Sequence, residues 1–173
     1  HIFFLVPTGR GKQMTGDEMT PQEYEQAFNG IWNVSKEVKI KLKVTCAPHF
    51  YRLVRARASQ GIVSEQIDPA SKGCLAGTGV CFVSHRGEVY PCGYMQVAAG
   101  DLRRESFTDI WNNSRLFLDL RDTSKLTGKC GVCGYADICG GCRAKALAKS
   151  GDYQAEDPCC AYLPKEEAKA QNA

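Results

Sequence analysis

The sequence lacks several features that would point to common classes of protein. No run of about eighteen apolar residues occurs, so we expect no membrane partner. The net charge of +3 is too small to favour a nucleic-acid partner. The chain begins at His1 instead of a methionine, so we expect a piece of a longer polypeptide, in which a missing signal peptide says little about compartment. Hydrophobic content of 43% and charged content of 24% then suit a globular protein of one or two small domains.

Cysteine is the residue that is present in excess. The chain holds ten, and nine of them follow residue 73. This uneven distribution predicts two domains. We expect a cysteine-poor domain over residues 1–60, a polar linker over 61–73, a cysteine-rich domain over 74–163 and a tail over 164–173.

The first quarter of the chain predicts a strand, a helix and a second strand. The run HIFFLV is continuously apolar, as expected of a strand buried on both faces. Thr20, Pro21 and Glu23 form a helix start of the capping-box type. Between Val38 and Val44 apolar residues alternate with lysines, which predicts a strand with one dry face. The order is typical of a parallel βαβ unit.

The lysines of this second strand suggest where the sheet ends. Charged side chains suit an edge strand, because they protect its open side from further pairing. We therefore predict an α/β fold with an open parallel sheet or an incomplete barrel that ends near this strand. A basic helix is expected after Pro48, with its arginines on a solvated face.

Two loops after these strands hold our candidate catalytic residues, Arg10, Cys46 and His49. Such loops lie at the C-terminal mouth of a parallel sheet, where α/β active sites are built. Arg10 could clamp a carboxylate. Cys46 could be a metal ligand, a hydrogen donor or a small buried residue, and His49 could be a general acid or purely structural.

The start of the cysteine-rich domain predicts a hairpin. The segment CFVSHRGEVYPC has turn residues at its centre, which would bring Cys92 close to Cys81. Two short helices are expected after it, capped by Ser106 and Ser114, and we interpret them as a packing platform.

The segment KCGVCGYADICGGCRA then carries four cysteines with the spacing C-x2-C-x5-C-x2-C, and DPCC supplies two more. Three kinds of chemistry fit. Ten cysteines in 173 residues are fewer than a disulfide scaffold usually has. Paired C-x2-C knuckles suit zinc, but they usually lie farther apart in the sequence. Dense cysteines among glycines are typical of iron–sulfur sites, which the spacing favours over zinc and disulfides.

A family resemblance adds to this reading. The pattern resembles the SPASM domain, a C-terminal extension of many radical S-adenosylmethionine enzymes, in Cys74-x12-Gly87-x4-Cys92, Cys130-x2-Cys133-x5-Cys139, Gly-Gly-Cys142 and a later cysteine. The residues before it resemble the last β/α units of the partial barrel of that superfamily. Within the superfamily, LVPTGRG and KVTCAPHF are most similar to the NirJ and Ahb-type subgroup of haem biosynthesis.

The resemblance implies two auxiliary 4Fe–4S clusters. The ligands implied for the first are Cys74, Cys81, Cys92 and Cys142. The ligands implied for the second are Cys130, Cys133, Cys139 and one of Cys159 and Cys160. Only two residues separate Cys139 from Cys142, where the family usually has three. This departure leaves open a single cluster held by the four cysteines of the run or by a mixture with the tail pair.

The resemblance also implies an activity for the intact protein. S-adenosylmethionine and a third 4Fe–4S cluster would bind in an N-terminal part, because the C-x3-C-x2-C motif of the catalytic cluster does not occur in this chain. The radical formed there would act on side chains of an iron tetrapyrrole, and the auxiliary clusters would take up the electron. An electron donor such as ferredoxin or flavodoxin and a cytoplasmic location are implied. A peptide-maturing enzyme, or a non-enzymatic zinc or electron-transfer module, are the alternatives.

Overall fold

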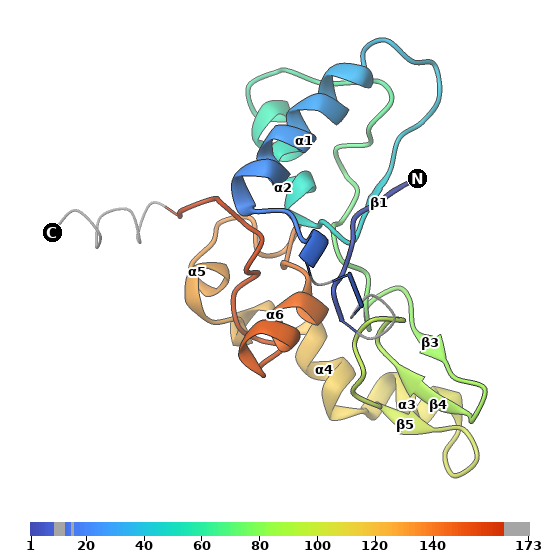
Figure 1. Cartoon of the computed structure of the whole chain (residues 1–173). Coiled ribbons are helices and arrows are strands. Elements are labelled where there is room, and N and C mark those ends of the chain that lie inside the picture. Colours follow the sequence, from blue (N-terminus) through green and yellow to red (C-terminus); the bar gives the residue numbers. More distant parts are fainter. Residues whose placement is uncertain (9–12, 15, 165–173) are drawn as a thin grey trace, which may run out of the picture.

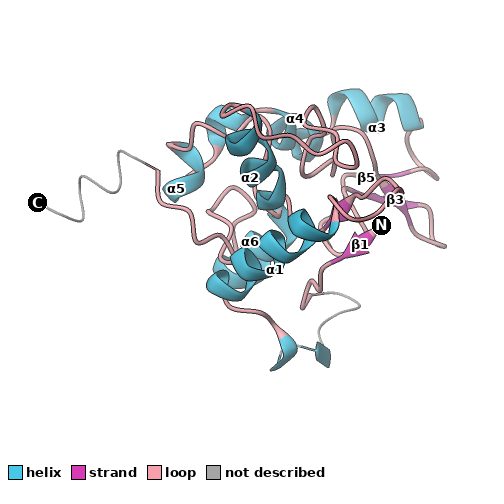
Figure 2. Ribbon diagram, turned by 90° about the horizontal axis from the view of Figure 1, so that it is seen from above, coloured by secondary structure: helices cyan, strands magenta, loops and turns pink. Residues whose placement is uncertain are grey.

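The computed structural model describes residues 1–8, 13–14 and 16–164 (Figure 1). Helices and loops make up most of this part of the chain, and strands form only two small sheets (Figure 2). No helix in these residues is long and apolar enough to cross a membrane.

The first sheet and the helix between its strands form a parallel βαβ unit, as the sequence predicted. Strand β1 (Ile2–Phe3) pairs in parallel with β2 (Val44–Thr45). Helix α1 (Pro21–Val34) connects them and has the expected capping box, in which the Thr20 hydroxyl accepts from the Glu23 backbone N–H. The sheet has these two strands in the described residues. The open barrel stays a prediction.

Both strands are shorter than the sequence predicted. Pairing is confined to residues 43–45, because the residues before them turn away, and the Leu42 N–H donates to the Gln66 carbonyl instead of to a strand. The alternation from Val38 to Val44 is therefore mostly irregular backbone. The expectation that the first strand is buried on both faces was also wrong, since Phe3 is 66% exposed.

Helix α2 (His49–Ala58) packs on α1 and closes the first core. This core is formed by large aromatic and aliphatic side chains, among them Tyr24, Phe28, Trp32, Phe50 and Val54. The expectation of a fully solvated arginine face on α2 was wrong at Arg52. That side chain is buried, because it pairs with Glu25 and lies over the Tyr162 ring at 4.8 Å.

Residues 61–73, the expected linker, lie against this core. Ile67 is 1% exposed and belongs to the same cluster of buried side chains. The Gly73 N–H donates to the Ile138 carbonyl, which joins the end of this segment to the cysteine-rich region.

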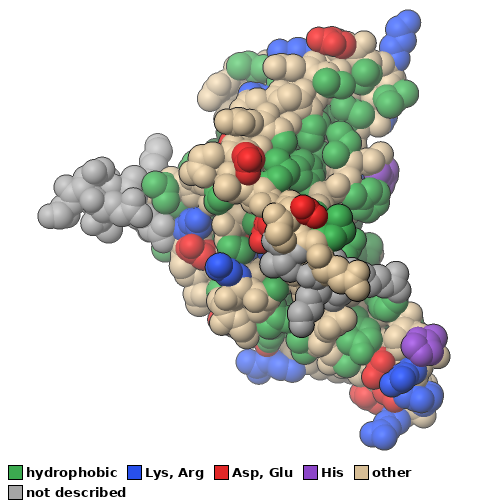
Figure 3. All heavy atoms as spheres, in the orientation of Figure 1, with side chains coloured by type: hydrophobic (Ala, Val, Ile, Leu, Met, Phe, Trp, Pro, Cys, Tyr) green, Lys and Arg blue, Asp and Glu red, His purple; other side chains and the backbone are tan. Residues whose placement is uncertain are grey.

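The second sheet contains the predicted hairpin. Strands β3 (Phe82–Val83), β4 (Glu88–Tyr90) and β5 (Gly100–Asp101) are antiparallel in that order. Helices α3 (Phe107–Asn113) and α4 (Arg115–Arg121) pack beside it, and Ile110 and Phe117 are fully buried, as expected of a platform. Charged side chains gather at the tip of this sheet (Figure 3).

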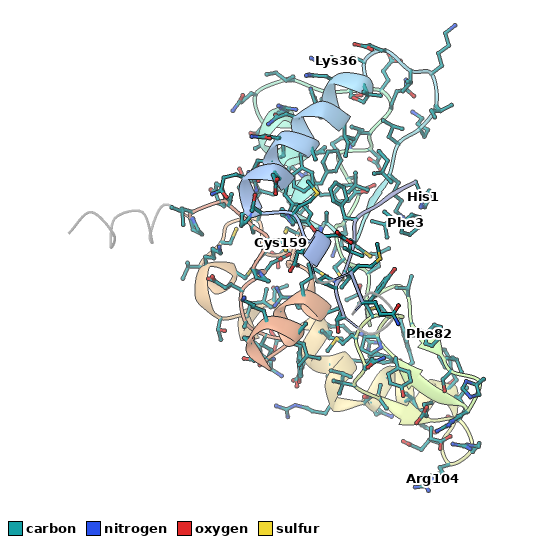
Figure 4. The ribbon with its side chains drawn as sticks, in the orientation of Figure 1. His1, Phe3, Lys36, Phe82, Arg104 and Cys159 are labelled. Carbon is teal, nitrogen blue, oxygen red and sulfur yellow. The ribbon has the colours of Figure 1, made fainter. Side chains whose placement is uncertain are left out.

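The last part of the chain packs against the first core, to which Cys159 belongs. The 3-10 helix η2 (Thr123–Lys125) and helix α5 (Gly128–Gly131) precede the dense cysteines, and α6 (Arg143–Ser150) follows them. Cys159 lies in the middle of the molecule, between α1 and α6 (Figure 4). This last part of the chain brings the cysteines of the C-terminal region next to α2 and to the first sheet.

Candidate metal centres

All ten cysteines lie in the described residues, and none of them forms a disulfide. Eight of them line two cavities in groups of four. These residues hold no set of three or more His, Cys, Asp or Glu side chains close enough to grip a single ion. Thiols around an iron–sulfur cube stand farther apart than those around one ion, because the cube occupies the space between them.

We call the smaller of the two cavities, with a volume of about 20 Å³, the tail cage. Its four thiols are those of Cys130, Cys133, Cys139 and Cys160. Helix α5 carries Cys130, and a glycine turn follows Cys139. In that turn Gly141 has φ +65°, and a Cβ there would meet the Arg143 guanidinium and approach Cys130 Sγ to 3.4 Å. The turn therefore requires glycine, both for its backbone and for the space beside the sulfur.

Backbone N–H groups point at the sulfurs of the tail cage. The Gly141 N–H donates to Cys139 Sγ and the Asp157 N–H to Cys130 Sγ, each at 3.4 Å. The Arg143 guanidinium lies 3.7 Å from Cys130 Sγ. Donors of this kind stabilise sulfur as thiolate, which is the form that binds metal.

Burial opposes that ionisation in the free thiols of the cage. It raises the pKa of Cys160 to about 11, while the backbone of Tyr162 and the charges of Arg52 and Lys129 act in the opposite direction. Burial also raises the pKa of Cys139. Metal binding here must therefore release protons from the thiols and supply positive charge in their place.

We call the larger cavity, with a volume of about 370 Å³, the mouth cavity. Its four thiols are those of Cys46, Cys74, Cys92 and Cys142. It opens beside the first sheet, where Phe3 and Val44 also line it. The Tyr94 N–H donates to Cys92 Sγ at 3.4 Å. Cys142 begins α6 and is buried in a cluster against which Cys46 and Cys92 also pack.

Cys81, which the resemblance groups with Cys74, Cys92 and Cys142, does not line the mouth cavity. Its side chain packs on Val89, Ile110 and Phe117 at the second sheet. Cys81 directly precedes β3, in which Phe82 pairs with Tyr90 of β4. The hairpin forms as expected, but Cys81 is not among the thiols that line the mouth cavity.

The side chains of Cys159 and Cys160 also line different cavities. Cys160 lines the tail cage, whereas Cys159 lines a separate cavity of about 420 Å³ beside Glu18 and Lys145. Cys159 Sγ lies 3.4 Å from Glu18 Oε1. Lys145 is buried next to it and donates to the Tyr24 hydroxyl.

Asp157 connects the two thiol groups, and sequence reasoning missed it. Its carboxylate is fully buried and accepts from the Cys142 N–H at 2.7 Å, while its own N–H reaches Cys130. Burial alone would raise the pKa of Asp157, but His49 and the N–H groups of Cys142 and Cys159 outweigh it and lower the pKa to about 2. The sequence signal that could have found Asp157 was its position in DPCC, two residues before Cys159.

The structure does not bring Cys46 and His49, the candidate catalytic residues that it describes, together in one site. Arg10 lies outside the described residues. His49 is fully buried between Tyr24 and Phe28, with Nδ1 3.6 Å from Asp157 Oδ2, and it does not line the mouth cavity. Cys46 follows β2 directly and lines the mouth cavity, at the C-terminal end of a parallel strand as expected.

Comparison with known proteins agrees with this arrangement. Residues 74–143 match SPASM, an iron–sulfur cluster-binding domain. The chain is 47% identical over 95% of its length to the AdoMet-dependent heme synthase of Methanosarcina barkeri, covering 48% of that protein. It is 45% identical over 95% of its length to the protein of the same name from Nitratidesulfovibrio vulgaris, covering 46% of it.

A shorter similarity reaches another kind of protein. The PqqA peptide cyclase of Xanthomonas axonopodis is 41% identical over 100 residues, which are 54% of this chain and 27% of that protein. The chain spans about half the length of the heme synthases that it matches. The chain thus matches the SPASM iron–sulfur cluster-binding domain over residues 74–143, and along nearly all its residues it is similar to proteins named AdoMet-dependent heme synthase.

Proposed function

We propose that the chain is part of an enzyme of haem biosynthesis that modifies side chains of an iron tetrapyrrole by radical S-adenosylmethionine chemistry. The observation that carries the proposal is the high identity to two AdoMet-dependent heme synthases over nearly the whole chain. In this proposal the chain supplies two auxiliary 4Fe–4S sites and one wall of the substrate region. The catalytic cluster and S-adenosylmethionine bind in a part of the enzyme that this chain does not contain.

The donor sets fit two such clusters. Each of the two cavities is lined by four thiols, and thiolates are the usual ligands of a cubane cluster. Backbone N–H groups already point at Cys92, Cys130 and Cys139, as they do around bound clusters. When bound, clusters of this type take up and pass on single electrons. We assign Cys130, Cys133, Cys139 and Cys160 to the tail cage, and at least Cys74, Cys92 and Cys142 to the mouth cavity.

The surrounding residues hold these ligands in place. Asp157 fixes the Cys142 backbone and donates to Cys130, so one residue positions ligands of both sites. The mouth cavity lies beside the first sheet, whose strand ends would face the substrate in an open barrel. Arg10, which follows β1 in the sequence, would bind a carboxylate of the tetrapyrrole by a bidentate contact.

The finer features of the proposal follow from the family. We propose a domain division at residues 61–73, a ferredoxin or flavodoxin as electron donor, and a cytoplasmic location, where thiols stay reduced. A peptide substrate is the second candidate, because the similarity to a PqqA peptide cyclase covers 54% of the chain. The identity to heme synthases covers the βαβ unit as well, which favours the tetrapyrrole.

Iron and sulfide analysis of the anaerobically prepared chain tests the proposal first. We expect about eight iron atoms and about eight sulfides per chain, with broad absorbance near about 400 nm. A colourless chain that binds zinc would refute it. In the complete enzyme, Arg10→Ala should weaken binding of an iron tetrapyrrole with propionate side chains by about tenfold or more. Unchanged affinity would remove Arg10 from the substrate site.

A further inference from the structure

The mouth cavity has four thiols, but they are not the four that the family resemblance groups together. Cys74, Cys92 and Cys142 line it, Cys81 does not, and Cys46 completes the set. We propose that Cys46, at the end of β2, is the fourth thiolate ligand of the cluster in the mouth cavity, in place of Cys81. The inference rests on the proposed function, since it assumes that a 4Fe–4S cluster binds in this cavity.

The packing of Cys46 places its side chain among the other ligands. Cys46 and Cys92 both pack against the buried cluster that contains Val6 and Cys142. The three cysteines come from separate parts of the chain: the end of β2, the loop after β4 and the start of α6. They therefore approach the same space from different directions, as the corners of a cubane require.

The backbone at Cys46 gives an independent indication. Its φ is +64°, and no other residue except glycine has a positive φ in the described part of the chain. Glycine adopts this conformation without strain, whereas other residues rarely do. Such strain concentrates at functional sites, where a particular side chain is required. We interpret the strain at Cys46 in this way: the residue after β2 must be a cysteine because its thiol has to face the cavity.

A ligand at this position has a structural consequence. Cys46 belongs to the βαβ unit, whereas Cys74, Cys92 and Cys142 belong to the SPASM segment. A cluster held by all four would join the two units through iron. It would also lie directly at the end of β2, on the side where the substrate of an open barrel binds.

The test compares Cys46→Gly with the matched variant Cys81→Ala in the full chain, reconstituted anaerobically with ferrous iron and sulfide. Cys46→Gly removes the thiol and relieves the backbone strain, so it separates a ligand from a merely structural residue. We expect the Cys46→Gly chain to lose between about one and about four of about eight iron atoms, and to give an altered or three-iron EPR signal. Cys81→Ala should keep its iron content and its EPR spectrum.

Any other pattern overturns the inference, including unchanged iron and EPR in Cys46→Gly or loss of iron in Cys81→Ala. Should Cys46→Gly fail to fold, Cys46→Ser provides a second test, because a serine oxygen can replace the thiolate with a changed spectrum. An unchanged spectrum in Cys46→Ser would then contradict the proposal. The wild-type chain separates the two proposals: if it binds no iron–sulfur cluster, the proposed function fails as well, whereas clusters that ignore Cys46 refute only this inference.

Discussion

The tail cage and the mouth cavity use the same four-thiol donor set, but the chain assembles them in different ways. Three thiols of the tail cage lie between residues 130 and 139, and the space among them is about 20 Å³. The thiols of the mouth cavity span residues 46 to 142 and surround about 370 Å³. A short glycine-rich segment thus closes on one site, while the other depends on how the two sheets are joined.

This difference suggests separate tasks for the two sites. Arg52, Lys129 and Tyr162 cover the tail cage, so the protein largely sets the environment of a cluster there. The mouth cavity lies beside β1 and β2 and, at about 370 Å³, has room for a larger group. We therefore expect the tail site to pass electrons and the mouth site to respond to substrate.

The largest effect is expected from removing one thiol of the neighbouring pair at the tail. Cys160→Ala should lower the iron content of the anaerobic chain from about eight to about four atoms, since Cys160 closes the tail cage. Cys159→Ala is the matched control and should retain its iron, because Cys159 lines a different cavity beside Glu18. Iron and sulfide analysis with EPR measures both.

Loss of iron in Cys159→Ala with full retention in Cys160→Ala would reverse the assignment. Equal loss in both variants would show that the tail pair acts through folding of the whole turn. The spacing of the sequence alone left these two cysteines equivalent. They differ only because neighbouring side chains in the turn after Asp157 point in different directions.

Local signals in the sequence predicted the local structure well. The capping box at Thr20, the hairpin, and the helix capped by Ser106 all form where expected, because each depends on residues close together in the chain. Ser114 is also the N-cap residue of a helix, but its side chain makes no capping hydrogen bond. The prediction of an extended strand before Val44 was wrong, because backbone N–H groups there donate to carbonyls outside the sheet, as Leu42 does to Gln66.

Long-range features could not be read from the sequence. Cys81 packs against the cluster that contains Phe117, which lies 36 positions further along the chain, and it does not line the mouth cavity. The burial of Arg52, Lys145 and Asp157 depends on partners far away in the chain. The tail cage is therefore the part of the site that spacing predicts best, and the mouth cavity is the part that needs coordinates.

A smaller effect is expected from the glycine that closes the tail cage. In Gly141→Ala the new Cβ would meet the Arg143 guanidinium and lie 2.9 Å from Asp157 Cβ, with φ at +65°. We expect the free energy of unfolding to fall by about 2–3 kcal/mol, with a lower yield of the tail cluster. Gly151→Ala has φ +79° but no atom within 4 Å of the new Cβ, so it should lose only about 1 kcal/mol through strain.

Urea unfolding and iron analysis of the two glycine variants distinguish crowding from backbone strain. The Gly151→Ala chain should load both clusters normally. Equal losses of stability in the two variants would mean that the space beside Cys130 is not restrictive. In that case the closed form of the tail cage would need another explanation.

The smallest expected effect is acid weakening of the frame around the tail cage. Asp119 on α4 accepts from Lys125, which precedes α5, and from Tyr153, which follows α6. Lys125 lowers the pKa of Asp119 most; burial opposes this, and Tyr153 and Arg115 add to the lowering, so that the pKa reaches about 2. Because the folded pKa lies below the ordinary value of 3.8, the stabilisation is complete above about pH 4 and is lost as the pH falls towards 2.

We expect Asp119→Asn to lower the free energy of unfolding by about 1–2 kcal/mol at neutral pH, after allowance for the solvent exposure of Arg115. The difference from wild type should shrink between pH 4 and pH 2, because the wild-type carboxylate becomes protonated there. Urea unfolding of the metal-free chain across this range measures the effect. Asp17→Asn, at an exposed position, is the control and should parallel wild type. A constant difference between Asp119→Asn and wild type at every pH would show that hydrogen-bond geometry, and not the charge of Asp119, holds α4 to the segments that flank the tail cage.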